Sequence, residues 1–171
     1  QHTEKVLGGV LATGMEFGPD GALYIADWVD GWKTNNAGKI WKLDDSSTGE
    51  HSKNRMEVAA LLTQDFKHFD SKTLEKHLDN ADMRIRQKAQ FALVESKEDA
   101  VNAFKQTLDN VTKRLARVHA IWGLGQLARK NSAHAEILTP LLSDSDPEIR
   151  AQAARALGDL RYSPSAKKII P

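Results

Sequence analysis

The chain has 171 residues, of which 40% are hydrophobic and 27% charged, a composition typical of a globular protein that can bury a core. Its 24 basic and 23 acidic residues leave a formal net charge of +1, so there is no electrostatic reason to expect binding to nucleic acid or to an anionic membrane. The sequence contains no cysteine, which excludes disulfides, thiolate-bound zinc, iron–sulfur clusters and CxxCH haem attachment within these residues.

Residues 1–50 are rich in turn-forming and aromatic residues. Eight of the 11 glycines and three of the four tryptophans fall in this segment. Gly18-Pro19-Asp20-Gly21 is a turn by composition, because proline presets φ and glycine tolerates a positive φ. Strand-forming residues flank it at 11–17 and 22–28, and residues 39–43 alternate between polar and apolar. The pattern predicts a small three-stranded antiparallel β segment.

A polar stretch rich in Ser, Thr and Gly at 46–53 suits a linker, and we place the domain boundary between residues 50 and 51. Residues 51–171 are predicted to be helical, beginning with a first helix at 56–69, and they contain an internal repeat. The pattern Arg-x-x-Ala-x-x-small-Leu occurs three times, beginning at Arg86, Arg117 and Arg150, with spacings of 31 and 33 residues. Small residues at helical spacing let neighbouring helices approach closely, as stacked helix pairs require.

Each copy of this pattern is predicted to be the second helix of a pair. The second helices are expected near 83–94, 114–129 and 147–161, and their shorter first helices at 72–78, 99–108 and 134–142. Asp82 and Asp146 fall in the turn before a second helix, where they can cap it or pair with an arginine. Pro147 falls at a first helical position, where its missing N–H costs nothing. The middle copy has Thr112 and Lys113 in place of the acidic turn.

These pairs resemble HEAT repeats over roughly residues 70–171. The expected fold class is therefore mainly α: a HEAT-like α–α superhelix, or solenoid, with a small N-terminal three-stranded antiparallel β segment. Pro171 lies 31 residues after Pro140, one repeat length, so a partial fourth repeat is expected from residue 165. Because the chain begins with Gln1 and ends within a repeat, we expect it to be a fragment of a larger protein.

The N-terminal segment carries a second resemblance. Residues 17–28 (FGPDGALYIADW) and 39–43 (KIWKL) resemble one β-propeller blade, nearest to the last blade of glucose/sorbosone-dehydrogenase-like propellers, a quinoprotein-related group. In one group of large bacterial multidomain proteins, such a propeller is followed by HEAT-like repeats and a c-type haem domain. Asp27-Trp28 with Gly31-Trp32, and His119 to Trp122, also resemble that group. The resemblance implies a periplasmic or extracellular parent protein.

Neither activity of that group is assigned to this chain. A single blade cannot close a propeller, so a quinone or sugar site would lie almost wholly outside these residues. The haem domain requires CxxCH, and the chain has no cysteine. No HExxH or GxSxG motif is present either, and we therefore name no catalytic, cofactor-binding or metal residue.

Two groups in the β segment have both a functional and a structural interpretation. Five oxygen-bearing residues could ligate calcium, but turn capping is the favoured interpretation because EF-hand spacing is absent. These are Asp20, Asp27, Asp30, Asn35 and Asn36. Three tryptophans could stack on a sugar, but we expect them to pack the sheet against the first helix. These are Trp28, Trp32 and Trp41.

The second helices also present positions that vary between repeats. One row consists of Lys88, His119 and Gln152, and the next of Phe91, Trp122 and Arg155. Equivalent positions line one face of a solenoid, so these six residues are the candidate contact surface. The alternative is that Phe91 and Trp122 belong to the core and His119 is solvated. Six repeat arginines are predicted to form inter-repeat ion pairs rather than an anion site, namely Arg84, Arg86, Arg114, Arg117, Arg150 and Arg155.

The expected function is a non-catalytic scaffold that binds another protein or the neighbouring domains of its parent. Nucleic acid and membrane partners are not expected, and no apolar run approaches the roughly 20 residues of a membrane span. Self-association through the β segment is a further expectation, because its apolar strands would lack propeller neighbours. The alternative function is the C-terminal section of a quinone-dependent sugar or alcohol dehydrogenase-like enzyme. A third, a lyase-type HEAT protein acting on a bilin, requires acidic and aromatic groove residues that the Lys88, His119 and Gln152 row does not supply.

Overall fold

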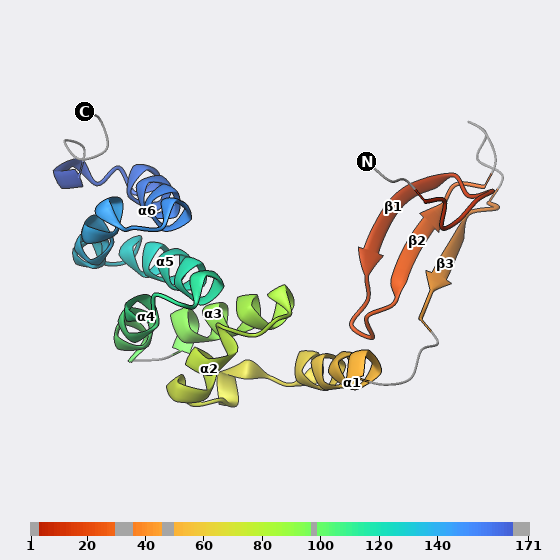
Figure 1. Ribbon diagram of the computed structural model, residues 1–171, viewed down its shortest axis with the longest axis horizontal. Coiled ribbons are helices and arrows are strands. Elements are labelled where there is room, and N and C mark those ends of the chain that lie inside the picture. Colours follow the sequence, from red (N-terminus) through yellow and green to blue (C-terminus); the bar gives the residue numbers. More distant parts are fainter. Residues whose placement is uncertain (1–3, 30–35, 46–49, 97–98, 166–171) are drawn as a thin grey trace. The chain divides into compact units, whose positions relative to one another are not determined.

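The computed structural model describes residues 4–29, 36–45, 50–96 and 99–165 (Figure 1). The chain divides into two compact units, 1–63 and 64–171, and each is described by itself. The first unit contains strands β1 (Ala12–Phe17), β2 (Leu23–Asp27) and β3 (Lys39–Leu43), followed by helix α1 (Glu50–Thr63). The division thus assigns α1 to the unit that contains the sheet, whereas the sequence boundary between residues 50 and 51 assigned it to the repeats.

The second unit is helical. Its elements in chain order are η1 (Phe66–His68), α2 (Ser71–His77), α3 (Met83–Ser96), α4 (Ala100–Asp109), α5 (Arg114–Ala128), η2 (Ser132–Ser143), α6 (Pro147–Asp159) and η3 (Ser163–Ser165), where η denotes a 3-10 helix. A mainly α fold with a small antiparallel sheet confirms the predicted fold class. The partial fourth repeat falls largely on 166–171, outside the described residues.

The sheet is an antiparallel meander in the order β1-β2-β3. The Gly-Pro-Asp-Gly turn joins the first two strands, as predicted: the N–H of Gly21 donates to the carbonyl oxygen of Gly18 at 2.9 Å, and Gly21 adopts a φ of 75°. A side chain is strained at that φ, which explains the glycine. The strands begin and end within one residue of their predicted limits.

One face of the sheet is apolar. Directly opposed residues of neighbouring strands share a face, so the register forms one row from Met15, Ile25 and Trp41 and a second from Phe17, Leu23 and Leu43. Ile25 in the central strand is buried, but Met15 is 65% and Phe17 60% exposed. Both outer strands therefore leave their apolar side chains open to solvent.

The predicted packing of the tryptophans onto a helix does not enclose the two that the structure describes. Trp28 and Trp41 are each 43% exposed. The indole N–H of Trp41 donates to Oδ2 of Asp27 at 2.7 Å, so this side chain is held by a hydrogen bond across the sheet. Trp32 lies outside the described residues.

Helix α1 is attached to the sheet by Arg55. This side chain donates to the backbone oxygen of Asp20 through Nε and Nη2, at 3.2 and 2.9 Å, and to the carboxylate of Asp44 at 2.5 Å. The helix was predicted at 56–69, but it ends at Thr63, and Phe66–His68 forms a separate 3-10 turn. The Asp65 carboxylate caps that turn by accepting from the backbone N–H of Lys67, which favours a break in the helix here.

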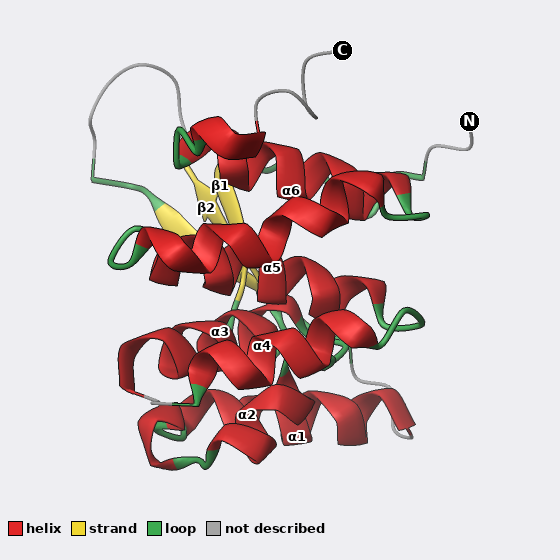
Figure 2. Cartoon of the chain, turned by 90° about the vertical axis from the view of Figure 1, so that its left-hand side faces the viewer, coloured by secondary structure: helices red, strands yellow, loops and turns green. Residues whose placement is uncertain are grey.

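Three helix pairs form the second unit: α2 with α3, α4 with α5, and η2 with α6. Figure 2 shows these pairs stacked one above the next, from α2 near the bottom to α6 near the top. The second helices match the predicted ranges within about two residues. The first element of the last pair was predicted as an ordinary helix but is 3-10, and it contains Pro140, which lacks the N–H that an α-helical turn would use.

The apolar residues that recur in each repeat motif form the core of the second unit. The motif alanines Ala89, Ala120 and Ala153 are fully buried. The motif leucines are buried in the same way, at Leu93, Leu124 and Leu157. Because residues four apart lie on one face of a helix, each second helix turns this alanine–leucine stripe inward. The opposite side is left to carry residues that differ between repeats.

Candidate functional site

The arginine that opens each repeat motif has a structural role. Arg86 donates to the backbone oxygens of Asn80 and Ala81 at 2.7 and 2.8 Å, in the turn between α2 and α3. Arg150 binds the carbonyl oxygens of residues 144 and 145 in the same way, and Arg117 donates to the carbonyl oxygen of residue 108. Each motif arginine thus fixes the turn between the two helices of its own pair.

Two arginines of α5 also join neighbouring repeats. Arg117 donates to the Asp144 carboxylate at 2.5 Å, and Arg114 pairs with Asp146. The guanidinium groups of Arg117 and Arg114 hold the pKa of Asp144 and Asp146, respectively, below the usual value. Inter-repeat pairing is therefore confirmed for these two arginines.

The other predicted arginine pairs differ. Arg84 pairs with Asp82 two residues earlier, so that bridge lies within one repeat. Arg86 and Arg150 bind backbone oxygens instead of carboxylates. Arg155 is exposed on α6 and forms no ion pair with any acid in the described part of the chain.

The first predicted contact row is not a continuous surface. Lys88 donates to the carbonyl oxygen of Gln64 at 2.9 Å and lies over the Phe66 ring. His119 is only 4% exposed, which corrects its assignment to an accessible surface. Gln152 donates to Glu148 at 2.7 Å and accepts from the indole N–H of Trp122 at 2.8 Å.

His119 instead belongs to a buried chain of hydrogen bonds. Arg86 can only donate, so its Nε–H bonds to Nε2 of His119 at 3.2 Å, and Nδ1–H must then donate to Oε1 of Gln90 at 2.8 Å. Nε2 of Gln90 in turn donates to Oε1 of Gln126 at 3.2 Å. Burial, with a smaller contribution from the Arg86 charge, lowers the pKa of His119 to about 4, so the ring is neutral at pH 7.

The second predicted row lies at the surface. Phe91 and Trp122 are each 42% exposed, so neither ring is enclosed in the core. Trp122 is nevertheless held firmly, because its N–H bonds to Gln152 and its ring meets the His119 ring edge-on at 5.0 Å. The buried histidine therefore supports an exposed tryptophan.

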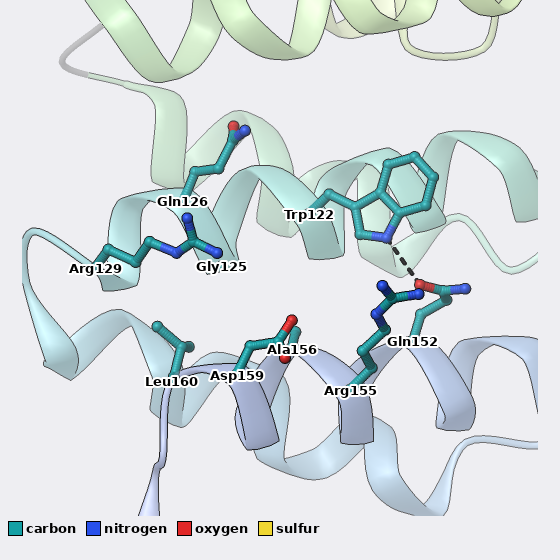
Figure 3. A pocket seen from close by; sticks show the side chains of 9 residues that line it. All are labelled: Trp122, Gly125, Gln126, Arg129, Gln152, Arg155, Ala156, Asp159 and Leu160. Carbon is teal, nitrogen blue, oxygen red and sulfur yellow. Dashed lines mark hydrogen bonds between the residues drawn. The ribbon is translucent and has the colours of Figure 1, made fainter.

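A hollow of about 320 Å³ lies between α5 and α6 (Figure 3). Its lining residues are Trp122, Gly125, Gln126, Arg129, Gln152, Arg155, Ala156, Asp159 and Leu160. A second hollow, of about 440 Å³, is lined by Phe91, Val94, Glu95, Gln126, Arg129 and Lys130, from α3 and α5. Gln126 and Arg129 line both, so the two hollows adjoin. We call the surface formed by these two linings the second-helix groove.

Four of the six predicted contact residues line or border this groove: Phe91, Trp122, Gln152 and Arg155. Lys88 and His119 do not. The sequence analysis missed Gln126, Arg129 and Asp159, although a signal was available. Gln126 lies four residues after Trp122, Arg129 seven, and Asp159 four after Arg155, and this spacing keeps all of them on the faces of the aromatic and the arginine.

The acidic residues of the β segment are used in its turns. Asp27 accepts from the backbone N–H groups of Leu11 and Val29, each at 2.9 Å, besides its bond to Trp41. Asp20 accepts from Tyr24 and pairs with Lys42, which lowers the pKa of Asp20 to about 2. Among the described residues, no cluster of three or more acidic or histidine side chains could hold a metal. Asp30 and Asn35 lie outside the described residues.

The stacked helix pairs of the second unit define the class of α-solenoid repeat proteins. Within that class, residues 101–170 match the family model of HEAT repeats. The match covers the second and third helix pairs, and the repeat resemblance is confirmed there. No curated protein matches the chain. The propeller resemblance of the N-terminal segment receives no support from these matches. Within the described ranges, no helix is both long and apolar enough to span a bilayer.

Proposed function

We propose that this chain is a non-catalytic protein-interaction scaffold that binds a segment of a partner protein in the second-helix groove. The observation that carries the proposal is the pair of half-exposed rings, Phe91 and Trp122, at equivalent positions of successive repeats on a hollowed surface. Exposed aromatic side chains in a pocket are the usual anchors of protein interfaces. HEAT repeats generally serve as scaffolds for protein interaction, which supports the same function.

The shape of the groove also supports binding of a chain segment. Gly125 contributes no side chain to the lining of the α5–α6 hollow, and an added Cβ there would meet only the Ala156 side chain, at 3.8 Å. Trp122 is fixed before binding by its hydrogen bond and by its contact with His119. A rigid aromatic anchor loses little entropy when a partner binds, which favours affinity.

A display library of short peptides, selected against the whole chain, tests this function. We expect selected peptides to lose at least about tenfold in affinity when Phe91 or Trp122 is replaced by alanine. Val111→Ala is the matched control, because Val111 is exposed but lies in the α4–α5 turn outside the groove. Peptides that bind both aromatic variants as well as they bind the unaltered chain would contradict a groove site.

The apolar face of the sheet favours a second candidate role. We propose that the first unit associates through this face with neighbouring parts of a longer protein or with a second copy of the chain. Met15 and Phe17 on β1 are largely exposed, and Trp41 and Leu43 on β3 are partly exposed. Exposed apolar patches of this kind are typical of surfaces that another protein covers.

The finer form of that role is a propeller blade within a dehydrogenase-like parent that is located in the periplasm or outside the cell. It is supported by the antiparallel meander and its open apolar face, since blades in a propeller cover one another. Titration of a soluble quinone and calcium into the chain tests the enzymatic alternative. Saturable binding of both would favour it, and unchanged intrinsic fluorescence of the tryptophans would favour the scaffold.

A further inference from the structure

The arginines in the first turns of the second helices are held by carboxylates or backbone oxygens: Arg84, Arg86, Arg114, Arg117 and Arg150. Three other arginines of the repeats, Arg129, Arg155 and Arg161, form no ion pair with an acid among the described residues. Of these, Arg129, which directly follows α5, and Arg155 of α6 line the hollow between α5 and α6. The repeat fold therefore does not account for these two guanidinium groups.

Figure 3 shows the two side chains extending from facing helices into this hollow. Arg129 follows the last turn of α5, where the helix dipole favours a cation, but this does not explain why its guanidinium lines the hollow. Arg155 lies in the middle of α6 and has no such explanation. A guanidinium offers a planar set of N–H donors that matches a carboxylate, so two unpaired ones in a hollow favour a carboxylate ligand.

The charge of the groove selects among anions. Asp159 offsets part of the positive charge of Arg129, Lys130 and Arg155. Glu95 offsets none of it, because its carboxylate is already paired with Lys67 at 2.9 Å. Asp159 lies in the same hollow as the two arginines, and its carboxylate would repel a ligand of high charge density. A modest positive excess fits one or two carboxylates better than the continuous phosphates of a nucleic acid.

The same hollow offers an apolar contact next to the cations. Trp122 lines it together with Ala156 and Leu160. Because the indole N–H of Trp122 is already bonded to Gln152, the ring is available to a ligand through its apolar surface and not as a hydrogen-bond donor. A ligand that fills the hollow therefore needs an apolar side chain close to an acidic one.

We propose that the second-helix groove recognises an acidic segment of a partner protein, in which a carboxylate binds Arg129 and Arg155 and a neighbouring apolar side chain packs on Trp122. This inference rests on the proposed scaffold function and names the chemistry of its partner. Gln126 lines the groove as well and is held in place, since it accepts from Gln90 at the end of the buried chain that begins at Arg86.

The test uses a random-peptide display library with the whole chain, followed by titration of one selected peptide by fluorescence anisotropy. We expect the selected peptides to share Asp or Glu next to a Leu, Phe or Trp. Replacing their acidic residues with Gln should weaken binding by about tenfold or more, and so should the double variant Arg129→Gln/Arg155→Gln. Raising the salt concentration should weaken the binding of the unaltered chain more than that of the double variant.

The matched control is Lys72→Gln/Lys105→Gln, which removes two exposed positive charges on the first helices α2 and α4, outside the groove. It should leave peptide affinity within about twofold, because exposed charges at a distance are screened. Equal unfolding midpoints would show that both double variants are folded, and an unfolded arginine variant would be replaced by Arg129→Lys/Arg155→Lys, which keeps the charge but not the planar fork.

Three outcomes would overturn the inference. A neutral or basic consensus would do so, as would binding that is indifferent to the arginine pair, or an oligonucleotide that binds as tightly as the acidic peptides. If Trp122→Ala still abolishes binding in such a case, the scaffold function stands and only the acidic partner is wrong. If neither Trp122→Ala nor the arginine pair matters, the groove proposal fails as well.

Discussion

Gly123 illustrates how the second repeat differs from its neighbours. The equivalent motif positions are Ala92 and Ala156, but a Cβ added at Gly123 would overlap the ring of Phe104. Phe104 is fully buried in α4, so its ring cannot move away. The larger first-helix side chain therefore requires the smaller residue on the second helix, and the sequence repeat alone showed only that this position is small.

We expect Gly123→Ala to destabilise the chain although alanine is the better helix former. The overlap with Phe104 should cost about 1–3 kcal/mol in the free energy of unfolding, as overpacking in a closed core does. Gly125→Ala and Gly158→Ala are the controls, because these two helical glycines lie at equivalent positions of α5 and α6. The first meets only Ala156 at 3.8 Å and the second nothing within 4 Å, so each should be neutral or stabilise by up to about 1 kcal/mol. Urea unfolding of the three variants measures this, and equal effects would contradict it.

His119 shows a role that the sequence could not reveal. Lys88 and Gln152 lie at the equivalent position in the other two repeats. Only the packing of α3 against α5 places His119 beside Arg86 and Gln90. Its pKa of about 4 lies below the ordinary value of 6.5. Between these two values the unfolded chain binds a proton at this residue and the folded chain does not.

The free energy of unfolding should therefore fall as the pH is lowered from about 6.5 to about 4, by up to about 3 kcal/mol from His119. Burial also lowers the pKa of His77, which adds to the fall in the same direction. Replacing His119 with Gln, whose amide can donate and accept hydrogen bonds but is not protonated in this range, should flatten this part of the profile. His68→Gln is the control, because that side chain is 83% exposed. Chemical unfolding at several pH values measures this dependence. If the His119 variant loses stability with falling pH as steeply as the unaltered chain does, His119 is not the cause.

At the scale of elements, periodic patterns predicted most of the fold. The strands were predicted because turn residues mark their ends. The second helices were predicted because alanine and leucine recur at a fixed spacing. The patterns failed where a tertiary contact or a backbone constraint decides. Pro140 lies in the first element of the third helix pair, which is a 3-10 helix. Asp65 caps the 3-10 turn that follows the end of α1. Trp41 bonds to Asp27 and is not enclosed by a helix. The groove was predicted in part, through Phe91, Trp122, Gln152 and Arg155, because repeated surface positions share one face.

The packing of the second helix pair on the third should depend more on the Arg117–Asp144 ion pair than on the Arg114–Asp146 ion pair. The side chains of Arg117 and Asp144 are 4% and 13% exposed, whereas that of Arg114 is 61% exposed in its pair with Asp146. Arg117→Met would leave the Asp144 carboxylate buried without its cation and should cost about 3 kcal/mol in the free energy of unfolding. Arg114→Met, in the same helix, should cost less than about 1 kcal/mol. Guanidinium would screen charges, so urea is the suitable denaturant, and similar losses for the two variants would contradict this ranking.

At the scale of the whole molecule, the two units bury their apolar residues differently. The repeats enclose theirs between stacked helix pairs, with a fully buried alanine–leucine stripe in each second helix. The sheet of the first unit has only one well-buried strand, β2, and its apolar side chains on β1 and β3 remain exposed. An isolated three-stranded sheet needs a covered apolar face to be stable, so we expect self-association of the chain through the first unit, whereas a partner segment binds in the groove of the repeats.

Phe17→Lys should therefore weaken self-association of the chain, measured as solution mass by light scattering over a range of concentrations. Phe17 is 60% exposed on the apolar face, so a lysine there adds charge to the proposed interface without opening a cavity in a core. Val111→Lys places the same charge on the α4–α5 turn, where the side chain is also exposed, and should leave the mass unchanged. If Phe17→Lys alone shifts the chain toward the monomer, the sheet is the association surface. If the unaltered chain is a monomer at every concentration, the sheet does not need a partner, and the groove on the repeats remains as the interaction surface of the molecule.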